Sequence, residues 1–206
     1  MYTLDPREIT GRDNYKLMSG SVVPRPIAFV TTRSDENGVI NAAPFSFFNV
    51  VSSDPPLLSI SIARKDGIMK DTARNVLAHK ELVVHICDEA IIAEVNETAA
   101  ILEPHESELE RTKLTPVPST KVAVPGIKEA LIRMECELYQ HIPITNDDGK
   151  PMSDLLLVRI VQYHFSQEVY NPDKGYILMD HLKPVSRLAG NDYAKLGERF
   201  TIIRPE

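Results

Sequence analysis

The sequence predicts a mainly β protein with helical insertions, and three observations support this fold class. Short runs rich in β-branched and aromatic residues recur along the chain, and turn signals made of Asp, Asn, Gly and Pro separate them. The few segments with helical periodicity are short. These features favour an antiparallel barrel over a doubly wound parallel sheet, in which helices alternate regularly with strands.

Length and charge limit the classes of protein to consider. A chain of 206 residues that is 43% hydrophobic and 25% charged can bury a substantial core, so we expect a single domain over 1–206. Its formal net charge of −6 provides no global attraction for polyanions, which argues against a nucleic-acid partner. An anionic ligand would have to be bound by a local cluster of cations.

Motifs that carry common chemistry are missing from the sequence. The two cysteines match no metal or redox spacing, the six histidines are scattered, and no glycine-rich dinucleotide or phosphate loop occurs. We therefore expect no metal site and no catalytic side chain, with the chemistry supplied by a cofactor. The N-terminus lacks an apolar run and no stretch has the length of a membrane span, so we expect a cytoplasmic protein without membrane contact.

The first half of the chain alternates short helices and strands. We expect a helix over 13–20, capped by Asp13 and ended by Gly20, and then a hairpin in which 35–38 turns between 27–32 and 39–41. Asp54-Pro55-Pro56 precedes a strand over 57–62. The next expected elements are a helix over 70–79 with Asp71 or Thr72 near its N-cap, a strand over 81–86 and a helix over 88–99.

The second half contains an excursion from the barrel and a long hairpin. A helical and loop excursion is expected around 88–125, with Ser107 and Glu110 forming a capping box for one helical turn. The segment 131–140 alternates apolar residues with Arg133, Glu135 and Glu137, which predicts a strand with one core face and one face in water. A strand over 155–165 pairs with it, and 187–197 suggests a short terminal helix.

The segment 41–49 is the first candidate binding segment. Small residues permit a close approach of the backbone, while Ser46 and Asn49 offer polar groups beside the aromatic Phe47 and Phe48. A flat heteroaromatic ligand requires this combination of apolar contact and directed polar contacts. An ordinary core strand would have the same composition.

The segment 59–72 is the second candidate. Arg64 and Lys70 flank a turn that leads into a helix N-terminus, where free backbone N–H groups and the helix dipole favour a phosphate. Asp71 would repel a phosphate, so we expect its side chain to turn back onto the helix. The alternative is that Asp71 only caps the helix and the lysines are solvated.

The order of these segments resembles the flavin reductase-like, FMN-binding split-barrel family. The resemblance rests on 23–32, on Asn41, Ala43, Pro44, Ser46 and Phe48 with their spacing, on 54–56, and on Lys70-Asp71-Thr72 with Asn75. The C-terminal segment 183–193 is similar to the flavoredoxin-like branch, with Ala189 in place of an expected glycine. The match extends over nearly the whole chain.

The resemblance implies a six-stranded Greek-key barrel that forms a homodimer, with FMN near the interface and a C-terminal interface tail over 183–206. It implies that Arg64, Lys70 and Thr72 hold the phosphate, with Ser61 nearby, and that Tyr193 reaches the flavin of the other subunit. The full set of implied cofactor-binding residues is Thr31, Thr32, Asn41, Ala42, Ala43, Pro44, Ser46, Phe47, Phe48, Asn49, Ser61, Arg64, Lys70, Asp71, Thr72 and Tyr193.

The implied function is an FMN-dependent oxidoreductase, a flavin reductase that takes electrons from NADH or NADPH. Its acceptor would be free flavin, oxygen, a metal or a partner protein such as a monooxygenase. Two alternatives stay open: a non-catalytic flavin carrier reduced by another protein, and a related barrel that oxidises a pyridoxine phosphate or binds another phosphorylated ring.

Overall fold

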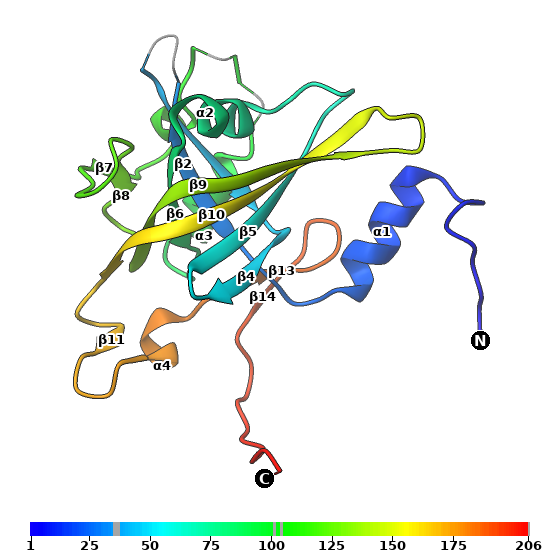
Figure 1. Cartoon of the computed structure of the whole chain (residues 1–206). Helices are drawn as coiled ribbons and strands as arrows, with labels where there is room; N and C mark the ends of the chain where they lie inside the picture. The colour runs from blue at the N-terminus through cyan, green and yellow to red at the C-terminus, as the bar shows by residue number, and fades with distance from the viewer. Residues whose placement is uncertain (35–37, 101, 104, 206) are drawn as a thin grey trace.

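A computed structural model describes residues 1–34, 38–100, 102–103 and 105–205. Its main feature is one antiparallel sheet of seven strands in the order β3-β2-β6-β9-β10-β5-β4 (Figure 1). The strands are β2 (Ala28–Arg33), β3 (Ile40–Phe45), β4 (Phe48–Ser53), β5 (Pro56–Ala63), β6 (Glu81–Ile86), β9 (Ile132–Thr145) and β10 (Pro151–Phe165). The mainly β class with helical insertions is confirmed.

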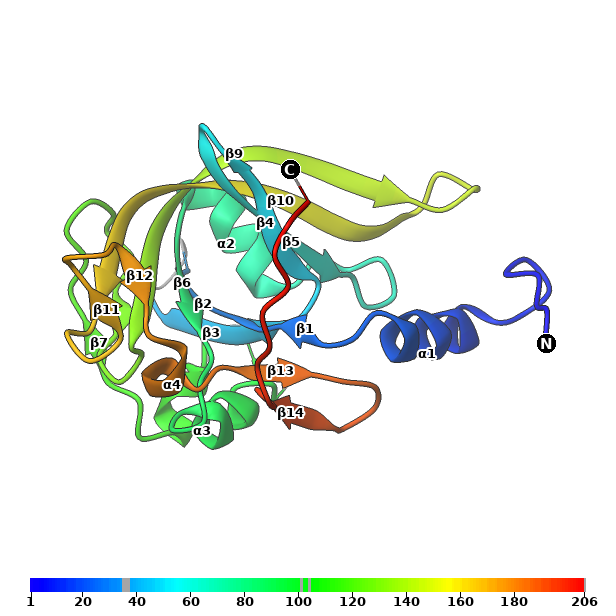
Figure 2. The same cartoon turned by 90° about the horizontal axis from the view of Figure 1, so that it is seen from below.

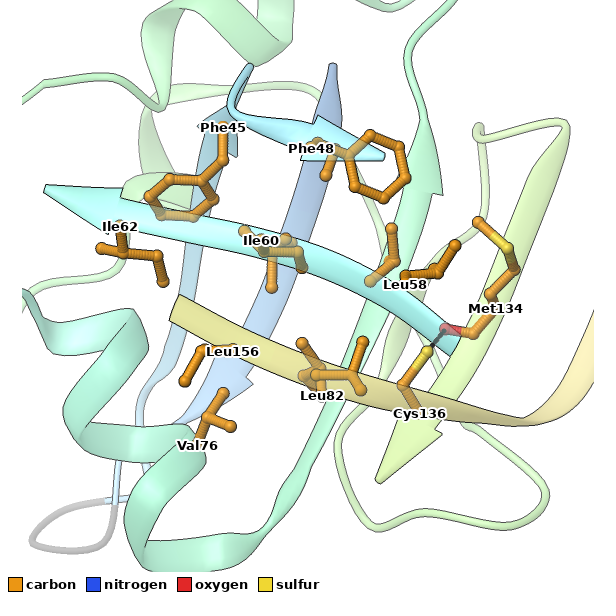
Figure 3. Packing of buried hydrophobic residues seen from close by; sticks show 14 of the residues in the cluster. Phe45, Phe48, Leu58, Ile60, Ile62, Val76, Leu82, Met134, Cys136 and Leu156 are labelled. Carbon is orange, nitrogen blue, oxygen red and sulfur yellow. Dashed lines mark hydrogen bonds between the residues drawn. The ribbon is translucent and has the colours of Figure 1, made fainter. Parts of the chain in front are cut away.

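The sheet curls around one apolar core. All seven strands contribute buried side chains to the same cluster, and the helix α2 (Asp71–His79) adds Ala73 and Val76 (Figure 3). The two edge strands β3 and β4 follow one another in the chain, and the ladder is not closed between them. This open, curled sheet agrees with a split barrel, whereas closure as a six-stranded Greek key stays a prediction.

Both expected hairpins are present. β2 pairs with β3 from Ala28 opposite Phe45 to Arg33 opposite Ile40, although 35–37 of the connecting turn lie outside the described residues. β9 and β10 pair along their whole length and extend beyond the body of the molecule, on the side where the first helix also projects (Figures 1 and 2). The strand predicted over 81–86 is β6.

The N-terminal helix begins earlier than expected. In α1 (Gly11–Ser21) the N-cap is Thr10 and not Asp13, because the Thr10 hydroxyl accepts the Asp13 N–H at 3.1 Å and donates to the Asp13 carboxylate at 2.7 Å. These two bonds form a reciprocal capping arrangement in which Asp13 occupies the third helical position.

The next two helices differ in how well they follow their predictions. The helix expected over 70–79 is α2, with Lys70 as its N-cap and Asp71 and Thr72 beside it in the first turn. The helix predicted over 88–99 shortens to α3 (Ile92–Glu97), because Asp88 Oδ1 accepts the N–H groups of Ala90 and Ile91 and makes a turn before it.

The excursion after α3 packs against the outer face of the barrel. It contains the 3-10 helix η1 (Glu108–Arg111) and the short strands β7 (Pro116–Val117) and β8 (Gly126–Ile127). A second apolar cluster joins Ile91, Val95 and Leu109 to Phe29 and Ala42 of the sheet. The predicted capping box is wrong: Ser107 donates its hydroxyl to the Ile40 carbonyl at 2.6 Å instead of capping η1.

The predicted wet face of the 131–140 strand is wrong at Glu135, which is 1% exposed. The loop over 119–124 covers this carboxylate, which accepts N–H groups from Thr120, Lys121 and Val122 and a hydrogen bond from His164. Burial by itself would raise the pKa of Glu135, but these hydrogen bonds outweigh it and lower the pKa to about 2.

The C-terminal segment forms strands where a helix was expected over 187–197. β13 (Val185–Arg187) pairs with β14 (Tyr193–Lys195) and with β1 (Arg25–Pro26), because Gly190, at φ 58°, turns the chain back. Before them lie β11 (Tyr170–Asn171), β12 (Tyr176–Ile177) and α4 (Met179–Leu182). Figure 2 shows this small sheet beside α3 and α4. No helix within the described ranges is long and apolar enough to cross a bilayer.

The buried Glu135 carboxylate generates a prediction about acid stability. Since its folded pKa of about 2 lies below the ordinary glutamate value, its contribution is present above about pH 4.5 and is lost as the pH falls towards 2. We expect the wild type to lose about 3 kcal/mol of unfolding free energy through this group over that range. Urea unfolding of Glu135→Gln should show lower stability at pH 7 and a flatter acid profile, whereas exposed Glu137→Gln should follow the wild type.

Candidate functional site

A cavity of about 760 Å³ lies at the edge strand β3, beside the start of α2. Its walls come from β3, from the end of β5 with its connection into α2, and from Thr98, Ala99, Ala100, Leu102 and Glu108 of the excursion. Of the sequence-predicted binding residues, the structure places seven on its wall. These are Asn41, Ala43, Pro44, Arg64, Lys70, Asp71 and Thr72.

The cation of Lys70 is available at this cavity. Lys70 is exposed and lines the cavity, and among the described residues no carboxylate lies within ion-pair distance of its ammonium group. It is also the N-cap of α2, so the first N–H groups of the helix lie beside it without intrahelical acceptors. Asp71 turns back as expected, because it accepts a hydrogen bond from Arg74 one turn along. The arrangement suits a phosphate.

Arg64 differs from this picture because its charge is already compensated. Its Nε and Nη2 donate to the two oxygens of Asp154 at 2.8 and 2.7 Å, and the Asp154 side chain is fully buried. His141 Nε2 contacts the same carboxylate at 2.8 Å. Burial would raise the pKa of Asp154, but the hydrogen bonds from Arg64 and His141 lower it overall. Arg64 can therefore donate hydrogen bonds into the cavity from a fixed position, but its positive charge is already neutralised by Asp154.

A buried polar network forms the inner wall. Asn41 Oδ1 accepts the hydroxyls of Thr72 at 2.8 Å and Thr32 at 3.3 Å, and Thr32 in turn accepts Asn75 Nδ2 at 3.1 Å. Asn41 Nδ2 donates to Glu108 Oε1 at 2.7 Å. The network thus joins β2, β3, α2 and η1, and it occupies the hydroxyl protons of Thr32 and Thr72.

The other predicted residues lie away from the cavity wall. Ala42 and Phe48 are core residues, and the Thr31 hydroxyl donates to the Pro125 carbonyl at 2.7 Å. Ser61 is half-buried in β5. Their roles in cofactor binding stay predictions.

The connection between β3 and β4 leads out to the surface. Ser46 is half-buried and Asn49 is exposed, with its Oδ1 accepting the Val50 N–H. Phe47 is 40% exposed, and its ring centroid lies 6.2 Å from that of Tyr15 on α1. This segment adjoins the cavity through Pro44 and Phe45.

Tyr193 contacts its own subunit. Its hydroxyl donates to Asn96 Oδ1 at 2.9 Å, and the Arg187 guanidinium lies 4.4 Å from its ring centroid. Its expected contact with a flavin of the other subunit stays a prediction.

Sequence reasoning missed several residues of the site, among them three that take part in its polar contacts or line its far wall. Glu108 and Thr98 line the cavity from the excursion, and Asp154 holds Arg64 from a strand 90 positions away. The capping box predicted for this short helical turn paired Ser107 with Glu110 and left Glu108 out. Nothing in the sequence indicated that Glu108 lies against β3.

Comparison with known proteins identifies the family. The family model described as the flavin reductase like domain matches residues 18–183. The chain therefore belongs to the flavin reductase-like family.

Individual relatives cover the whole chain. YwrF of Bacillus subtilis is 61% identical over the full length of both chains. The crystal structure of nitrilotriacetate monooxygenase component B from Bacillus cereus is 52% identical, with a TM-score of 0.95 and 98% coverage of both chains. The 2-nitrobenzoate 2-nitroreductase NbaA of Pseudomonas fluorescens is 32% identical, with a TM-score of 0.87 over 99% of this chain and 96% of its own.

The Arg64–Asp154 pair generates a stability prediction. Asp154→Ala leaves a guanidinium whose side chain is 13% exposed without its counterion, so we expect a loss of about 3 kcal/mol of unfolding free energy. Asp180→Ala removes the exposed ion pair with Arg199 and should cost less than about 1 kcal/mol. Equal losses in urea unfolding at pH 7 would contradict the assignment of a buried, essential counterion.

Proposed function

We propose that the protein is an FMN-binding oxidoreductase, specifically an NADH- or NADPH-dependent flavin reductase. The observation that carries the proposal is the cavity at the N-terminus of α2, where Lys70 and free backbone N–H groups adjoin a largely apolar wall. Family membership supports a flavin, and the seat for one phosphate favours FMN.

The residues present fit this cofactor. The volume of about 760 Å³ lies within the range of cavities that enclose small ligands. Lys70 and the first turn of α2 would hold the phosphate, while Ala43, Pro44 and Phe45 offer apolar surface to a flat ring. Lys70 provides local positive charge in a protein of formal net charge −6.

Bound flavin supplies hydride acceptance at its N5 atom, so the proposal needs no catalytic side chain. The chain would bind and orient the ring. Since the sequence has no dinucleotide-binding loop, the nicotinamide would stack directly on an exposed face of the flavin and dissociate readily.

We further propose a cytoplasmic homodimer that passes electrons to a partner. The similarity to a monooxygenase component B supports an oxygenase as acceptor of the reduced flavin, and the similarity to a nitroreductase supports testing a nitroarene. Exposed apolar side chains on α1 and β4, among them Leu17, Met18 and Val50, support a subunit interface near Phe47.

Lys70→Ala tests the phosphate seat. Removal of one charge-assisted contact should weaken FMN binding by about 1.5 to 3 kcal/mol, or roughly 10- to 150-fold in Kd, in a fluorescence titration. Lys174→Ala, at an exposed turn between β11 and β12, serves as the matched control and should bind like the wild type. An unchanged Kd in Lys70→Ala would remove this lysine from the site. Absence of FMN uptake by the wild type in calorimetry would refute the proposed function itself.

Stopped-flow mixing of the FMN-loaded protein with NADH and with NADPH tests catalysis. We expect one nucleotide to bleach the flavin absorbance at about 1 per second or faster. The rival function is a non-catalytic flavin carrier reduced by another protein; it predicts no bleaching by either nucleotide. A visible spectrum without flavin bands would instead support the third alternative, in which the barrel oxidises a pyridoxine phosphate or binds another phosphorylated ring.

A further inference from the structure

Glu108 is a buried carboxylate on the cavity wall, and the phosphate seat does not use it. It is 7% exposed, although it lies in the excursion and not in the barrel. Its Oε1 accepts Asn41 Nδ2 at 2.7 Å, and its Oε2 accepts the Ala42 N–H at 3.0 Å. Among the described residues, no cation lies within ion-pair distance of it.

The position of Glu108 follows from the edge of the sheet. Ala42 lies on the edge strand β3, and its N–H points away from β2, so a carboxylate can satisfy it in place of a further strand. Ser107 does the same for the Ile40 carbonyl. These bonds fix Glu108 against β3 and leave the remaining lone pairs of its two oxygens available.

The surroundings of Glu108 define which ligand groups it can bind. Burial raises the pKa of Glu108, and the negative charge of Asp71 raises it further. A second anionic group on the ligand would be repelled here. Hydroxyl or N–H donors would complete the hydrogen bonding of the carboxylate and offset its desolvation.

We propose that Glu108 binds the hydroxyl groups of the ligand's sugar-alcohol chain and thereby selects a flavin that carries its ribityl chain. This inference rests on the proposed flavin site. Lys70 and α2 bind the phosphate end, and Asn41 and Thr72 link that turn to Glu108 through two hydrogen bonds. The ribityl chain connects the phosphate to the ring, so its hydroxyls pass the wall between these two regions.

The test compares three ligands that differ only along this chain. FMN, riboflavin and lumiflavin share the ring system, but lumiflavin has a methyl group in place of the ribityl chain. Glu108→Gln should raise the Kd of FMN and of riboflavin about tenfold and leave that of lumiflavin within about twofold. Glu110→Gln, an equal charge change at an exposed position of η1, should alter none of the three.

Other patterns overturn the inference. An equal loss for all three ligands shows that Glu108 only anchors the excursion to β3, and no loss for FMN shows that it does not touch the ligand. If Glu108→Gln fails to fold by circular dichroism, Glu108→Asp, which keeps the charge but shortens the side chain, is measured against the same criteria. Wild-type binding of FMN is recorded separately, so failure of the flavin site itself is distinguishable.

Discussion

The side-chain amide of Asn41 is the interaction on which the site depends. One oxygen accepts the hydroxyls of Thr72 and Thr32, and the nitrogen donates to Glu108. These bonds join the barrel, the helix that closes one end of it and the excursion that forms the far wall of the cavity. Buried groups of this kind are costly when unpaired, so the network favours a single arrangement of all three.

The same region separates two kinds of charge. Arg64 is compensated by the buried Asp154, whereas Lys70, beside the N–H groups of α2, and Lys65 on the preceding turn are exposed cations on the cavity wall. The proposed phosphate seat therefore relies on local charge and needs no broad basic surface on this acidic protein. Glu108 lies on the opposite side of the network and accepts hydrogen bonds from neutral donors.

Local patterns predicted most strands. Runs of β-branched and aromatic residues bounded by turn signals predicted β2, β3 and β6, whereas the alternation of apolar and polar residues predicted β9, which pairs with β10. Predictions failed where a distant segment supplied a partner: Ser107 bonds to the Ile40 carbonyl and does not cap η1, and a loop covers Glu135. The terminal helix failed because Gly190 turns the chain into a sheet.

The sequence by itself determined the mainly β class, the family resemblance and the placing of a cation at the start of α2, because each is carried by short local motifs or by the order of such motifs along the chain. Only the tertiary structure decided which polar groups are free to meet a ligand. The charge of Arg64 is compensated by Asp154, which lies 90 positions further along the chain. Glu108 lies on the cavity wall because it bonds to Asn41 and Ala42 of the edge strand, 67 and 66 positions before it. Hydrogen bonds form between groups that are near in space, and the distance between two groups in space cannot be read from their separation in the sequence.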